Sequence, residues 1–374
     1  MSTKKLFLAF ILVLLTSFPA AMSLYAQDNS AGAVYTMDNA TGGNNVLVFN
    51  RSADGSLTPA GSFSTTGLGT GTGLGNQGAV VLSRNGKFLF VVNPGSDEIS
   101  VFNVRPNGLI LRDKISSGGR RPISVTVHGN LVYVLNAGGS VGDSDNIAGF
   151  TIECKGNLVP IPGSTRPLSS GSTDPAQIEF NRDGSVLVVT EKATNILSTY
   201  TVDDDGMASA PNSQTSVGTT PFGFAFGKRD QLFVSEAFGG APDASAVSSY
   251  DLSEDGNLQV ISPSVGTNET AACWVVITKN GRFAYVTNTG SATVSGYQIN
   301  EDGTIALLDA DGITATTGAG PIDMALSRNS RFLYTLNSGS NTISLFEVNN
   351  DGSLTSLGPD LTGLPAGANG LAAR

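Results

Sequence analysis

Residues 320–357 read GPIDMALSRNSRFLYTLNSGSNTISLFEVNNDGSLTSL, and this stretch decides the fold. An apolar run is followed by a turn, by an aromatic-rich strand that ends in Asn337, and by a Gly/Ser loop. An alternating strand, an acidic-Gly turn and a last short strand complete the unit. The pattern recurs seven times along the chain, at a period of roughly fifty residues. Four strands per repeat at this period are typical of a propeller blade, so the sequence predicts an all-β, seven-bladed β-propeller with four-stranded blades.

The repeats also predict how the ring closes, and we name the four strand types a to d from the ring axis outward. The a strands are expected at 79–83, 123–127, 176–180, 222–226, 274–278, 322–327 and 368–373. The b strands are expected at 33–37, 88–93, 131–136, 186–190, 231–236, 283–288 and 332–337. The first b strand has no a strand before it, and the last a strand has no b strand after it. We therefore expect strands from the two chain ends to share one blade, which leaves no exposed strand edge.

Short turns that contain glycine join strand a to b and strand c to d. Pairs such as Asn85-Gly86 and Asp302-Gly303 supply the positive φ angles that tight hairpins require. These turns define one rim of the ring, called here the hairpin rim. The longer b–c and d–a loops must emerge on the opposite rim, called the upper face. Since loops on a rigid scaffold vary without disturbing the core, we expect a binding site on the upper face.

The N-terminus has the pattern of a secretory signal peptide. Lys4 and Lys5 precede the apolar stretch 6–18, and small residues come before Gln27. We therefore predict a signal peptide over 1–26 and a single propeller domain over 27–374. The protein is expected to be secreted or periplasmic, with no stable membrane span after cleavage.

Charge and motifs exclude several classes of function. The formal net charge of −10 and the absence of a basic stripe in the sequence argue against a nucleic-acid partner. No zinc, haem or nucleotide motif is present, so no metal or cofactor is expected. His128 is the one histidine and is expected in an a–b turn, which argues against Ser/His/Asp catalysis. We expect a monomer that binds a small molecule, a glycan or a peptide.

The repeat resembles a known family of propellers. The segments 332–337, 342–348 and 351–354 carry the likeness most plainly. They resemble the seven-bladed lactonase-like family, which includes 6-phosphogluconolactonase-type and carboxymuconate-cyclase-type proteins. The resemblance implies a propeller fold and the opening or closing of a lactone. Family members often carry a Pro-His pair where the d–a loop enters strand a, whereas this sequence has no histidine at any of those junctions.

The residues that end the b strands form the candidate site. They are Asn93, Asn136, Glu191, Glu236, Asn288 and Asn337. Two neighbouring blades thus place carboxylates where the others place amides, and Glu191 or Glu236 could act as a base towards water. Nearby in ring order, Arg121, Arg166 and Lys192 could hold an anionic substrate. The alternative is that all these polar residues cap strand ends and bond to loop amides.

Further side chains are expected to contribute to the same sector of the upper face. Asn136, Gln177, Trp274, Asn288 and Asn337 are candidate substrate-binding residues, although core packing is the alternative for Trp274. The sequence therefore favours an exported lactonase-like enzyme that hydrolyses or cyclises a small anionic lactone or organic acid. The alternative is a non-catalytic extracytoplasmic propeller that binds a partner on its upper face.

Overall fold

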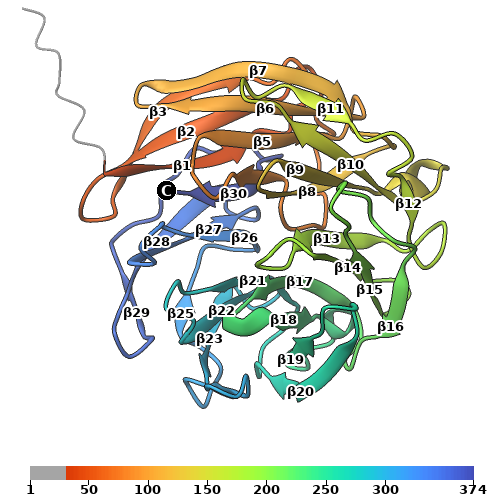
Figure 1. Cartoon of the computed structure of the whole chain (residues 1–374). Coiled ribbons are helices and arrows are strands. Elements are labelled where there is room, and N and C mark those ends of the chain that lie inside the picture. The colour runs from red at the N-terminus through yellow and green to blue at the C-terminus, as the bar shows by residue number, and fades with distance from the viewer. Residues whose placement is uncertain (1–30) are drawn as a thin grey trace, which may run out of the picture.

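The computed structural model describes residues 31–374 as a ring of seven antiparallel sheets around a central axis (Figure 1). The prediction of an all-β, seven-bladed propeller is confirmed. The predicted signal peptide over 1–26 lies outside the described residues. Within residues 31–374 no helix is long and apolar enough to cross a membrane.

Each blade runs from strand a at the axis to strand d at the outside. The a strands are β30 (Asn369–Ala373), β4 (Val80–Leu82), β8 (Pro122–His128), β13 (Pro175–Phe180), β17 (Pro221–Phe226), β21 (Ala272–Ile277) and β26 (Pro321–Leu326), for blades 1 to 7. The b strands are β1 (Gly32–Met37), β5 (Phe88–Asn93), β9 (Leu131–Asn136), β14 (Val186–Glu191), β18 (Gln231–Glu236), β22 (Phe283–Asn288) and β27 (Phe332–Asn337). Both series match the sequence prediction closely because their apolar runs are bounded by turn residues.

The outer strands are less regular. The c strands are β2 (Asn45–Arg51), β6 (Glu98–Arg105), β10 (Asn146–Ile152), β15 (Ile196–Thr201), β19 (Ala246–Leu252), β23 (Thr293–Ile299) and β28 (Thr342–Val348). The d strands are β3 (Leu57–Ser64), β7 (Gly108–Ser116), β11 (Leu158–Pro160), β16 (Asn212–Thr215), β20 (Leu258–Gly266), β24 (Ile305–Leu307) and β29 (Leu354–Ser356), with β12 (Arg166–Pro167) and β25 (Ala315–Thr316) as second outer segments. Three short 3₁₀ turns lie in loops: η1 (Gly138–Val141), η2 (Lys228–Asp230) and η3 (Phe238–Gly240).

Blade 1 is built from both ends of the described chain, as predicted. β30 pairs antiparallel with β1, with Tyr35 opposite Ala372 and Met37 opposite Asn369. The Thr36 hydroxyl donates to the Asn369 carbonyl at 3.2 Å. Blade 1 therefore has four strands in the order β3-β2-β1-β30, and the inner side of β1 is not left unpaired.

Hydrogen bonds from one blade to the next end on the glycines of the c–d turns. Buried tyrosines in the b strands donate to three of these carbonyls: Tyr133 to Gly206 at 2.7 Å, Tyr285 to Gly352 at 2.7 Å and Tyr334 to Gly55 at 2.8 Å. Hydroxyls in the c strands reach two more: Thr199 to Gly256 at 2.6 Å and Ser249 to Gly303 at 2.8 Å. These glycines have φ between 79° and 93°, so the turn residue that permits the hairpin also presents the acceptor that joins the blades.

Removing one of these hydroxyls tests this contact. Tyr334→Phe should lower the free energy of unfolding by about 1–2 kcal/mol, because the Gly55 carbonyl loses its partner in a buried setting. Urea unfolding measures the change. Tyr285→Phe, which removes the same bond between blades 6 and 7, is the matched comparison. Unchanged stability in both variants would show that these bonds do not hold neighbouring blades together.

Candidate functional site

The upper end of the central channel is filled by the segment Leu74–Gly78, which precedes β4. The Trp274 indole Nε1 donates to the Asn76 carbonyl at 2.7 Å, from the blade on the far side of the ring. The Gln77 side chain donates to and accepts from the Val275 backbone, at 2.8 and 3.1 Å. Bonds to blades 3 and 4 complete the crossing: the Asn76 amide donates to the Ile123 carbonyl, and the Gln77 N–H donates to the Ala176 carbonyl at 3.0 Å. This segment thus closes the channel near the upper face.

Below this plug lies a cavity of about 460 Å³. Its walls come from the later halves of the a strands, and Gln77 and Gly78 form its inner end. The cavity is also lined by residues near the ends of these strands: Leu82, Arg84, Val127 and Leu326. Because strand a runs from the upper face to the hairpin rim, the cavity lies towards the hairpin rim. The sequence pattern favoured a site at the opposite rim, and this difference arises because the d–a loop before β4 fills the upper mouth.

The carboxyl of Glu179 lies in the middle of this cavity wall. Strand register places Val81, Thr126, Ala225, Val276, Ala325 and Ala372 at the same level of the other six a strands. None of these six is a carboxylate. Gln177 donates its Nε2 to Glu179 Oε2 at 3.0 Å, and the same amide is anchored on the Phe224 backbone by bonds of 2.7 and 3.0 Å. The neighbouring strand therefore fixes the orientation of the Glu179 carboxyl.

Two further polar side chains line the same cavity. Thr126 Oγ1 accepts the Phe180 N–H at 3.1 Å, which leaves its hydroxyl proton available in the wall beside Glu179. Asp323 accepts the backbone N–H groups of Met324 and Leu371 at 2.8 and 2.9 Å. The cavity thus combines apolar walls with a few convergent polar groups, as small-molecule sites commonly do.

The acidity of both carboxyls is shifted by their surroundings. Glu179 is half-buried in the wall of the channel, and desolvation by the surrounding protein raises its pKa to about 8. Burial also raises the pKa of Asp323 well above its usual range, against the two backbone N–H groups that favour the charged form. A carboxyl with a pKa near neutrality can give up and take back a proton under ordinary conditions.

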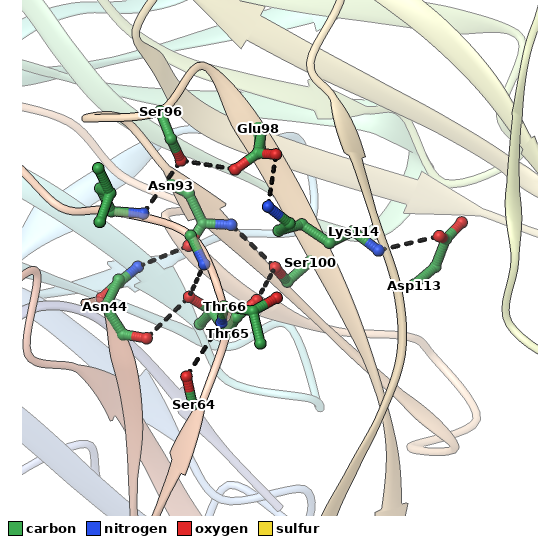
Figure 2. A network of polar contacts seen from close by, with 12 residues as sticks. Asn44, Ser64, Thr65, Thr66, Asn93, Ser96, Glu98, Ser100, Asp113 and Lys114 are labelled. Carbon is green, nitrogen blue, oxygen red and sulfur yellow. Dashed lines mark hydrogen bonds and ion pairs between the residues drawn. The ribbon is translucent and has the colours of Figure 1, made fainter.

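The residues that end the b strands form a repeated latch between the b strand, the c strand and the d–a loop that precedes the blade. In blade 2, Asn93 donates to the Ser100 hydroxyl at 2.8 Å and accepts from Asn44 at 3.0 Å (Figure 2). Ser100 in turn donates to the Thr65 carbonyl at 2.9 Å. Asn288 and Asn337 donate to the hydroxyls seven residues later, Ser295 and Ser344, both at 2.8 Å.

Glu191 and Glu236 occupy the same latch position and are fully buried. Glu191 accepts the Ser198 hydroxyl at 2.6 Å, the Thr194 hydroxyl at 2.9 Å, and both the hydroxyl and the N–H of Ser169. Glu236 accepts the Gly218 N–H at 2.8 Å and the hydroxyls of Ser248 and Ser264 at 2.5 and 2.6 Å. All four carboxylate oxygens are therefore used by the fold, which supports capping. A catalytic role for the two glutamates stays a prediction.

The predicted cationic residues do not converge on one pocket. Arg166 lies in an outer strand and donates to the carbonyls of Ala208, Gly163 and Thr165. Arg121 donates to the Ser140 hydroxyl at 2.6 Å. Lys192 is nearer the axis, where it donates to the Gly75 carbonyl at 2.6 Å and lies 4.8 Å from the centre of the Phe222 ring. These contacts give each cation a main-chain or loop partner.

The other predicted binding residues divide between the core and the channel. Asn136 is fully buried and donates to Asn146 at 3.0 Å, so it belongs to the latch like Asn288 and Asn337. Trp274 is buried, holds the plug and packs on Phe222 at 4.9 Å between ring centres. Gln177 does line the channel cavity.

The sequence analysis missed Glu179 and Asp323. Both could have been found from the sequence, because each is a carboxylate inside a run predicted to form an inner strand. Glu179 lies in PAQIEF, and Asp323 lies in PIDMAL. Among residues 31–374 no group of three or more His, Cys, Asp or Glu side chains could hold a metal ion.

The fold and this channel define a seven-bladed propeller with a cavity on its axis that has apolar walls and a few polar groups. Residues 28–164 and 243–366 match the model of the family described as "Lactonase, 7-bladed beta-propeller", and the chain belongs to this family. The resemblance seen in the sequence is thereby confirmed. No match was found among the curated proteins.

Solved structures with the same fold share little sequence with this chain. A protein from Lactobacillus plantarum has a TM-score of 0.72 at 18% identity, covering 92% of this chain and 99% of its own. A candidate 6-phosphogluconolactonase from Bacteroides fragilis has a TM-score of 0.68 at 19% identity, covering 93% and 99%. The periplasmic gluconolactonase of Pseudomonas aeruginosa has a TM-score of 0.67 at 16% identity, covering 90% and 98%. At these identities the likeness shows the fold.

The latch predicts a structural effect for Glu191. Glu191→Ala should lower the free energy of unfolding by about 2–4 kcal/mol, because it leaves several buried donors without an acceptor. Glu191→Gln, which keeps an acceptor oxygen, should lose less. Urea unfolding measures both. Wild-type stability in Glu191→Ala would rule out the latch as its main role.

The channel carboxyl predicts a pH-dependent effect on stability. A pKa raised from 4.5 to about 8 means that the folded protein holds this proton more tightly than the unfolded chain, so its stability falls as pH rises between these values. Glu179→Gln removes this penalty. Its advantage in free energy of unfolding over wild type should therefore be larger at pH 9 than at pH 5. A difference that does not vary with pH would show that Glu179 titrates normally.

Proposed function

We propose that the protein is a hydrolase of small lactones and that the reaction takes place in the central channel. The observation that carries the proposal is Glu179: a carboxyl with its pKa raised to about 8, oriented by Gln177, in the wall of a cavity of about 460 Å³. Membership of the lactonase family supports the reaction class, and the lactonase names of two structural neighbours agree with it. The channel size suits a small molecule and not a polymer.

In the proposed reaction the Glu179 carboxylate takes a proton from a water molecule in the channel. The water oxygen attacks the lactone carbonyl carbon, and the ring C–O bond then breaks. The leaving alkoxide takes the proton back from Glu179, so one lactone and one water yield one hydroxy acid. The Thr126 hydroxyl and the protonated Asp323 carboxyl, both in the cavity wall, are the proposed donors towards the carbonyl oxygen.

Two further questions are where the protein acts and whether it turns its ligand over. The pattern of residues 1–26 supports secretion or a periplasmic location, and one neighbour is named as periplasmic. The alternative function, a propeller that binds a ligand without turning it over, is supported by the lack of histidine where the d–a loops enter strand a. Turnover in the experiment below separates the two.

The base role of Glu179 predicts both a loss of activity and a pH profile. With a panel of sugar and muconate lactones, Glu179→Gln should reduce kcat by about 10²–10⁴-fold, the range expected for removing a general base. The wild-type rate should rise about tenfold per pH unit below pH 8 and level off above it, because only the deprotonated carboxyl takes the proton.

Glu301→Gln, which changes an exposed carboxyl in a c–d turn, is the matched control and should keep full activity. Equal rates for Glu179→Gln and wild type would exclude this site. Binding of a lactone without any turnover by the wild type would favour the non-catalytic alternative.

A further inference from the structure

A ring of cationic side chains surrounds the channel at the hairpin rim. In blades 2, 4, 5, 6 and 7 the second residue after strand a is basic. In blade 1 a basic residue follows β30 directly. These residues are Arg84, Arg182, Lys228, Lys279, Arg328 and Arg374. The first five are exposed. The positions are far apart in sequence, so only ring closure brings them together.

These cations share hollows whose lining contains no Asp or Glu side chain. A cavity of about 500 Å³ is lined by Arg84, Arg182, Lys228, Lys279 and Arg328, together with main-chain and uncharged groups. Arg84 also lines the channel cavity, so the two hollows adjoin. A further hollow of about 630 Å³ continues past Lys279 and Arg328 to Arg51 and Arg374. No Asp or Glu lines either of the outer hollows.

The cations of the ring have no ionic partners in the part of the chain that the structure describes. The four ion pairs found in residues 31–374 involve other cations: Lys114, Arg120, Lys192 and Arg331. Two acids lie in the same a–b turns. Asp230 accepts the Arg182 N–H at 2.9 Å, and Asp183 accepts from Ser185 within its own turn. Neither forms an ion pair with a member of the ring.

This concentration of positive charge is unusual for a chain whose net charge is −10. Like charges around one opening repel each other and do not help the ring to fold. A hollow lined by one sign of charge, however, attracts and concentrates ions of the opposite sign. We propose that the hairpin rim carries a binding site for a small, multiply charged anion that bears phosphate or carboxylate groups. Guanidinium and ammonium groups are the side chains suited to both.

The surroundings of the ring favour a small anion over a long polyanion. The c–d turns lie on the same rim but farther from the axis, and five of them carry an exposed aspartate: Asp54, Asp205, Asp255, Asp302 and Asp351. A polymer crossing the rim would meet this outer acidic circle, whereas a small anion fits inside it. The proposal does not depend on lactone hydrolysis, because binding can be measured without turnover.

Calorimetric titration of the purified protein with inorganic tripolyphosphate and, separately, with citrate tests the site. Tripolyphosphate bears phosphate groups and citrate bears carboxylates, so the pair distinguishes a preference for phosphate from one for carboxylate. We expect binding of at least one, weakened as salt is raised. Arg84→Ala/Arg328→Ala should weaken it at least tenfold.

The matched control is Arg120→Ala/Lys155→Ala, which removes two exposed cations outside the ring and should bind as tightly as wild type. Thermal unfolding checks that both double variants are folded. Absence of binding by wild type, or equal weakening in both double variants, would overturn the proposal. Binding of heparin or DNA in place of both small anions would overturn it as well.

Discussion

Neighbouring blades are joined by hydrogen bonds that end on the carbonyl groups of c–d turn glycines, and five of the seven turns show this contact. The donor sits on one sheet and the acceptor on the next, so each bond fixes the angle between two blades. Because the last of these bonds runs from Tyr334 in blade 7 to Gly55 in blade 1, the same device operates across the closure. The width and shape of the central channel depend on these angles.

In the closed ring the upper end of the axis is filled by a loop, and the part below it is hollow. The loop segment Leu74–Gly78 crosses the upper end and forms hydrogen bonds through backbone and side-chain amide groups with blades 3, 4 and 6. Gly223 lets this segment approach closely, since a Cβ there would lie 2.2 Å from the Gln77 side-chain oxygen. Below the plug the inner strands carry small or aliphatic side chains at most positions, which leaves a cavity with Glu179 in its wall. The charged rim and the channel are thus two parts of one opening.

Much of the fold could be predicted from the sequence, because strand and turn signals are local. The apolar runs and the Asp-Gly turns located the b strands almost to the residue, and the mismatch in strand count predicted that β30 would join β1. The functions of individual side chains could not be obtained in the same way. Glu191 and Asn337 end equivalent strands, and their shared latch role follows from contacts with later hydroxyls that a strand boundary does not specify.

Glu179 was missed because its strand could be predicted from the sequence but its place in the channel could not. Alternation along PAQIEF places it in an inner strand, but only the closed ring reveals that the other six strands place no carboxylate at its level. The filling of the upper mouth was equally hidden, because a Gly- and Thr-rich loop gives no sign of where it will fold back. The most direct test of whether the reaction takes place in the channel is a crystal structure of the protein soaked with a hydroxy acid, the product of lactone opening. The account predicts density for the acid in the channel beside Glu179, whereas density on the upper face against Lys192, with an empty channel, would contradict it.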